Sequence, residues 1–131
     1  MRGSAQPLFG AAACLLACLA CGCGGSGGPT RYELSGTVTY GGQPVPAGTI
    51  DFEPEGVDVT AENMGHALIE KGQYKTLPKM GVIGGRQKVY INGTDGVAHE
   101  ESPLGAPIFR TFVTTIELPA ADATHDFEVP K

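Results

Sequence analysis

The residues best suited to covalent chemistry are four cysteines at the start of the chain, Cys14, Cys18, Cys21 and Cys23. The rest of the 131 residues contain no cysteine. Arg2 precedes an apolar run that closes on small residues, the three-part layout of a secretory signal peptide. Because the run is shorter than the roughly 20 residues that cross a bilayer, we expect cleavage on export rather than a retained membrane helix.

The spacing of these cysteines resembles the lipobox of bacterial lipoproteins, in which Leu, a small or apolar residue and Ala or Gly precede an acylated Cys. The tetrapeptide ending at Cys18 fits this pattern best by residue type, whereas Cys23 follows a longer apolar run and precedes a Gly-rich stretch. The resemblance implies palmitate-type acyl chains on Cys23 or Cys18, with Cys21 as the third candidate. At least two of the four cysteines then serve only as apolar residues of the signal.

Three segments follow from this layout: a lipoprotein signal peptide with its anchor cysteine over residues 1–23, a Gly-rich tether over 24–30, and one domain over 31–131. A flexible coil of about eight such residues spans roughly 15 Å. Without Arg2 the chain carries 8 Lys and Arg against 14 Asp and Glu, a net charge of −6. Such a domain has no electrostatic attraction for nucleic acid or anionic lipid, so we expect its membrane link to be covalent.

Alternation of apolar and polar residues dominates the domain and predicts strands covered on one side. We expect Leu34, Val38, Ile50 and Phe52 to face a core. Seven short strands are predicted, over residues 31–40, 49–54, 66–70, 73–76, 86–92, 111–118 and 125–129. Turns are expected over 41–48 and 92–96, and a long irregular loop over Val97–Arg110. An all-β sandwich or barrel follows from this spacing.

Carboxylates alternate along the second predicted strand at Asp51 and Glu53, and beyond it at Glu55. Alternate residues share a face, so with Asp58 and Glu62 these side chains could form a weak Ca²⁺ site, or simply a solvated acidic face. His66, His99 and His125 are dispersed along the chain and form no metal-binding motif, so we expect exposed histidines at strand ends and in a loop.

A Ser102, His99 and Asp95 triad in the long loop is the one catalytic arrangement that the residues allow, and no Gly-x-Ser-x-Gly motif supports it. Sugar binding by exposed aromatic rings has little support, because Trp is absent and only Tyr90 falls on the outward parity. We therefore expect no enzymatic activity and no cofactor.

The segment Tyr32–Ile50 resembles the opening of carboxypeptidase-regulatory-like domains, which have a transthyretin-like (prealbumin-like) fold. Gly72-Gln73-Tyr74 is similar to a hairpin of that family, and Gly85–Ile91 to a later strand with its aromatic displaced. The C-terminal Leu118–Ala120 and His125–Val129 resemble those of small planctomycete lipoproteins. The resemblance implies a seven-stranded Greek-key β-sandwich without catalytic function. The fold also hosts hydroxyisourate hydrolase, whose C-terminal Tyr-Arg-Gly-Ser is missing from this chain.

These features predict a non-catalytic, lipid-anchored β-domain of the bacterial cell envelope, held outside the cytoplasm and acting as a structural or protein-interaction module. The alternative is an extracellular glycan- or Ca²⁺-binding module that uses the Val97–Arg110 loop and the Asp51–Glu55 face. A hydrolase is the second alternative. The expected partners are the membrane, through the lipid, and an envelope protein or glycan.

Overall fold

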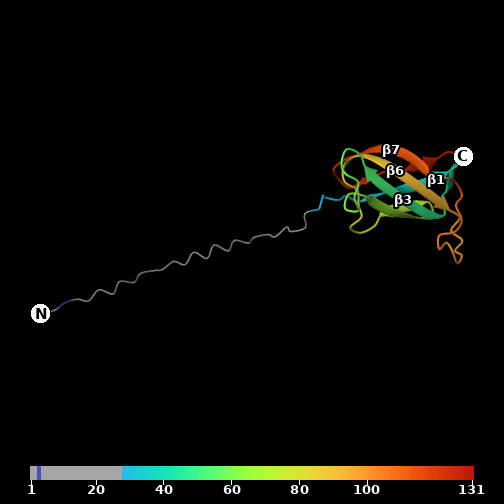
Figure 1. Ribbon diagram of the computed structural model, residues 1–131, viewed down its shortest axis with the longest axis horizontal. Helices are drawn as coiled ribbons and strands as arrows, with labels where there is room; N and C mark the ends of the chain where they lie inside the picture. Colours follow the sequence, from blue (N-terminus) through green and yellow to red (C-terminus); the bar gives the residue numbers. More distant parts are fainter. Residues whose placement is uncertain (1–2, 4–27) are drawn as a thin grey trace.

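The computed structural model describes Gly3 and residues 28–131, and within these residues the fold is all-β with no helix (Figure 1). The predicted signal segment and most of the tether, including all four cysteines, lie outside the described residues. The strands are β1 Leu34–Tyr40, β2 Gln43–Pro44, β3 Ala47–Pro54, β4 Gly65–Glu70, β5 Gln73–Thr76, β6 Gly85–Thr94, β7 Phe112–Leu118, β8 Ala123–Thr124 and β9 Phe127–Val129.

The strands form one curled sheet in the order β2-β1-β5-β4-β3-β6-β7, and these neighbours pair antiparallel. Its longest pairing is between β3 and β6, which keeps register from Ala47 opposite Thr94 to Pro54 opposite Gln87. The two short C-terminal strands β8 and β9 pair with β1 instead, and both run parallel to it. The chain therefore returns at its C-terminus to the strand with which the domain began.

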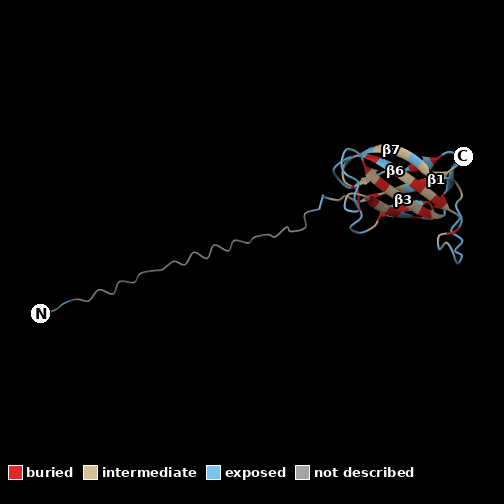
Figure 2. Ribbon diagram, viewed as in Figure 1, coloured by how far each residue is buried: buried red, intermediate tan, exposed pale blue. Residues whose placement is uncertain are grey.

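The predicted alternation is confirmed in the strands that build the core (Figure 2). Every second residue of β3 is buried, and Ile50 and Phe52 are completely so. Leu34 and Val38 of β1 are also fully buried, as expected. Burial of side chains this size stabilises a fold by about 1.5–3 kcal/mol each. The core is completed by Val45, Ala67, Ile69, Tyr74, Val82, Val89, Ile91, Leu118, Phe127 and Val129.

Strand β1 changes partners along its length. Ser35, Gly36 and Thr37 pair with β5, whereas Thr39 and Tyr40 pair with β2. Along its other edge the first half of β1 pairs with β8 and the second half with β9. Both edges of β1 are thus occupied, so this strand connects the hairpin of β4 and β5 to the C-terminal strands.

Two aspartates complete the pairing of β1 with the C-terminal segment. The Asp122 carboxylate accepts a hydrogen bond from the Glu33 N–H at 2.8 Å, and the Asp126 carboxylate accepts one from the Thr37 N–H at 2.9 Å. Between them the His125 N–H donates to the Ser35 carbonyl at 2.9 Å. Side chains therefore bind amides in β1 and directly before it that the short parallel strands leave without a backbone acceptor.

Aromatic rings hold the core where β9 crosses it. Phe127 of β9 lies 6.4 Å from Phe52 of β3 and 5.6 Å from Tyr74 of β5, measured between ring centroids. The Tyr74 hydroxyl donates a hydrogen bond to the His125 carbonyl at 2.5 Å. Burial raises the pKa of Tyr74, and the negative charge of Asp126 adds to the effect. Tyr74 therefore remains a neutral donor, and it anchors the C-terminal segment from inside the core.

Several predicted boundaries were wrong. The expected turn over 41–48 is confined to Gly41 and Gly42, because β2 occupies Gln43–Pro44 and β3 already starts at Ala47. Gly48 lies inside β3 opposite Gly93, where an added Cβ would overlap the Asn92 carbonyl oxygen. Glycine here allows two backbones to approach closely.

The remaining differences concern strand ends. The expected turn over 92–96 is strand as far as Thr94, because β6 continues its pairing with the unforeseen start of β3. His125 precedes the last strand by two residues rather than opening it. The described residues hold nine strands rather than seven, and the two extra ones, β2 and β8, have two residues each.

We predict that Gly36→Ala strongly destabilises the domain. A Cβ on Gly36 would overlap the His125 carbonyl oxygen, and because that atom belongs to the paired backbone it cannot move without breaking the β1 contacts. The expected loss in the free energy of unfolding is about 3 kcal/mol, at the upper end for overpacking. Urea denaturation measures it. The control is Gly28→Ala, where a Cβ meets no atom within 4 Å; an equal effect of the two substitutions would contradict the close contact.

Candidate functional site

A groove of about 740 Å³ lies on the outer side of the β4–β5 hairpin, beside the segment through which the chain reaches β1. Leu68 and Glu70 of β4 and Gln73 and Lys75 of β5 point outward and line it. The segment after β5, from Leu77 to Lys79, supplies another wall. Leu68 is one of few exposed large apolar side chains in the described residues. The groove thus combines an apolar surface with charged rims.

The charges of the groove are partly neutralised by one another. The Lys75 ammonium lies 3.2 Å from the Glu33 carboxylate, and both side chains are more than half exposed. Such a pair contributes little to stability. Lys79 has a φ of 64°, in a turn where the Met80 N–H donates to the Leu77 carbonyl. A lysine in this left-handed conformation is uncommon, and the turn holds its side chain at the groove.

Arg31 organises the adjoining loops. Its Nη1 donates to the carbonyls of Met64 and Gly81, each at 2.8 Å, and its Nη2 donates to those of Ala61 and Glu62. The planar fork of guanidinium donors suits several acceptors at once. Arg31 therefore binds the loop between β3 and β4 to the loop between β5 and β6, at the position where the tether joins the domain.

The acidic residues of β3 do not gather around one point. Asp51 bonds to His66 across the β3–β4 pair, with 2.5 Å between Oδ1 and Nδ1, and Glu55 forms an ion pair with Arg86 at 3.0 Å. Glu53 stands opposite Lys88 in the β3–β6 register. No group of three His, Cys, Asp or Glu residues arranged for a metal ion occurs among residues 28–131. Asp51, Glu53 and Glu55 instead each lie beside a basic residue, on a face of the sheet that solvent reaches.

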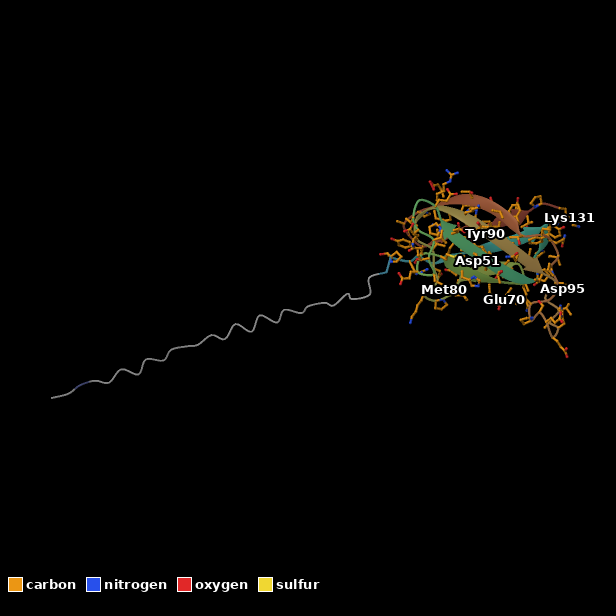
Figure 3. The ribbon with its side chains drawn as sticks, in the orientation of Figure 1. Asp51, Glu70, Met80, Tyr90, Asp95 and Lys131 are labelled. Atoms are coloured by element: carbon orange, nitrogen blue, oxygen red, sulfur yellow. The ribbon has the colours of Figure 1, made fainter. Side chains whose placement is uncertain are left out.

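His66 was expected to be exposed at the opening of a strand, but it follows Gly65 in β4 and is half-buried against Asp51. The sequence carried a usable signal: once β3 and β4 are paired as neighbours, Asp51 and His66 stand directly opposite each other. Tyr90, expected to be exposed, is half-buried in β6, and the Lys88 ammonium lies 5.6 Å from the centre of its ring. Figure 3 shows Asp51 and Tyr90 on the same part of the sheet.

The long loop contains no strand, as predicted, and its polar side chains bind its own backbone. The Asp95 carboxylate accepts from the Val97 and Ala106 amides at 2.9 and 3.1 Å. The Ser102 hydroxyl donates to the Gly105 carbonyl at 2.7 Å, and His99 and Ser102 pair through their main chains. The three residues of the hypothetical triad are thus brought near one another, but Asp95 and Ser102 use their side chains to shape the loop.

The candidate anchor residues Cys18, Cys21 and Cys23 lie outside the described residues. A search of the described part of the chain for a helix long and apolar enough to cross a bilayer finds none. Comparison of the chain with protein-family models, with curated proteins and with solved structures finds no match. The function of the chain is therefore inferred from its sequence pattern and from the geometry of the domain.

Proposed function

We propose that the chain is an exported lipoprotein, held at a cell-envelope membrane by acyl chains on Cys23 or Cys18, with its β-domain outside the cytoplasm. The confinement of every cysteine to the first 23 residues, next to an apolar run and a Gly-rich stretch, carries this proposal. It is supported by the position of the folded domain: within residues 28–131 the first contacts with the sheet are made by Arg31 and Tyr32, directly after the predicted tether.

We also propose that the domain is a Greek-key sandwich of the carboxypeptidase-regulatory-like type. The aromatic contact between Phe52 and Phe127 supports two facing layers, because β3 and β9 are not paired in the sheet. The motif residues that suggested the resemblance have structural roles consistent with it. Because Gly36 has no side chain, the C-terminal backbone can pack closely against β1 at this position. Tyr74, which follows the hairpin glycine Gly72, is buried in the core.

The role that we propose for the domain is non-catalytic binding of an envelope protein through the groove beside the β4–β5 hairpin. A surface that combines exposed apolar side chains with charged rims is typical of protein interfaces. The groove has this character through the exposed Leu68 and the half-buried Leu77 within a border of Glu33, Lys75 and Lys79. Its backbone support is rigid, because both edges of β1 and β5 are paired.

Acylation is tested by growth of a bacterial host with labelled fatty acid. We expect the full-length chain to incorporate the label. Either Cys23→Ala or Cys18→Ala is expected to abolish incorporation, because only one cysteine becomes the new N-terminus. Gel fluorography of the purified chain gives the result. Undiminished label in both single variants and in the double variant would contradict the assignment of the anchor to these positions.

The binding role is tested by cross-linking in the native envelope, followed by purification of the full-length chain. We expect Leu68→Glu to reduce the yield of a specific cross-linked species about fivefold or more, since loss of a central interface contact costs more than about 1 kcal/mol. Val113→Glu is the matched control, because Val113 is an equally apolar, exposed residue on the outer face of β7. Equal yields from the two variants would show that the groove is not part of the interface.

A further inference from the structure

Exposed apolar side chains gather at the end of the domain that the tether joins. Val57 and Val59 are each 49% exposed in the loop between β3 and β4, and Met80 is 41% exposed in the loop between β5 and β6. Figure 1 shows these loops at the same end of the domain as residue 28, and Figure 3 shows Met80 there. Three of the six exposed large apolar side chains in the described residues therefore lie at this end.

These two loops form one surface rather than two independent tips. The Arg31 guanidinium bonds to the carbonyls of Ala61, Glu62 and Met64 in the first loop and to that of Gly81 in the second. The His66 N–H also donates to the Met80 carbonyl at 2.9 Å. The apolar side chains are thus presented by backbone that is fixed to the sheet and to the residue that follows the tether.

Carboxylates predominate in the loop after β6, whereas basic residues stand among the carboxylates of the two loops. In the two loops and their borders, Arg31, Lys79 and Arg86 stand among Glu55, Asp58 and Glu62, and Glu55 pairs directly with Arg86. Glu117, opposite Arg86, and Asp122, which bonds to the Glu33 N–H, add carboxylates at this end. The loop after β6 carries Asp95, Glu100 and Glu101 and has no Lys or Arg before Arg110. Asp95 lies toward the opposite end of the domain from Met80 (Figure 3). An anionic bilayer surface would repel the acidic loop after β6.

We propose that the two loops rest on the lipid surface of the membrane to which the chain is anchored, with Val57, Val59 and Met80 in the interfacial region. The inference depends on the proposed acylation, which places the loops within a tether of about 15 Å of the lipid. A tether this short gives a high effective concentration, so that even a weak apolar contact is populated. The acidic loop around Asp95 then points away from the bilayer.

The absence of Trp from the chain allows a direct test. The acylated full-length chain is incorporated into phosphatidylethanolamine–phosphatidylglycerol vesicles, with or without brominated acyl chains, which quench Trp at interfacial depth. We expect the fluorescence of Met80→Trp and Val57→Trp to fall about twofold, because interfacial side chains lie roughly 5–10 Å into the boundary between headgroups and acyl chains. Val97→Trp, in the acidic loop, is the control and should be unaffected; Val97 is 66% exposed.

Flotation of the same vesicles tests the lipid anchor separately from the contact of the two loops with lipid. Co-flotation of the protein without quenching at positions 57 and 80 would overturn the lipid contact and leave the anchor in place. Equal quenching at positions 80 and 97 would overturn the orientation, and with it the assignment of this end to the membrane. Failure of the protein to float would contradict the proposed acylation and, because the inference depends on it, the lipid contact as well.

Discussion

The structure depends on the two-sided pairing of β1. One edge of this strand binds β5 and β2, and the other binds the C-terminal segment in parallel. Parallel strands require a long connection, and here nearly the whole domain forms it. The approach is close enough that only glycine fits at position 36, where the His125 carbonyl lies against the backbone. Phe127 and Val129 then enter the core as a consequence of that pairing.

The functional features lie close to the same strand. Arg31 precedes β1 by three residues and joins two loops through four carbonyls, so the tether, the loops and the first strand share one point of attachment. The groove runs beside the start of β1 and the β4–β5 hairpin. A partner bound there and a bilayer beneath the loops would both be held in a defined orientation, because the groove lies on paired strands and Arg31 and His66 bond the loops to one another and to the sheet.

Local patterns predicted much of the fold. Period-two burial identified the inward residues of β1, β3 and β6, and the Lys71-Gly72 turn identified the β4–β5 hairpin. These local patterns could not predict which distant segments of the chain pair with one another. The pairing of Val38 with Phe127, the meeting of Asp51 with His66 and the placement of Gly48 within a strand all depend on contacts far apart in the chain. The groove could not be predicted for the same reason, since its walls come from three separate segments of the chain.

Native-state amide hydrogen exchange tests the two-sided pairing of β1 most directly. The Val38 N–H donates to Gly72 on one side, and the His125 N–H donates to Ser35 on the other. If the C-terminal segment is integral to the fold, both amides open only by global unfolding and share one opening free energy and one denaturant dependence. Exchange of the His125 amide through a low-energy local opening, while Val38 remains protected, would show that β1 holds the domain together without its C-terminal partner.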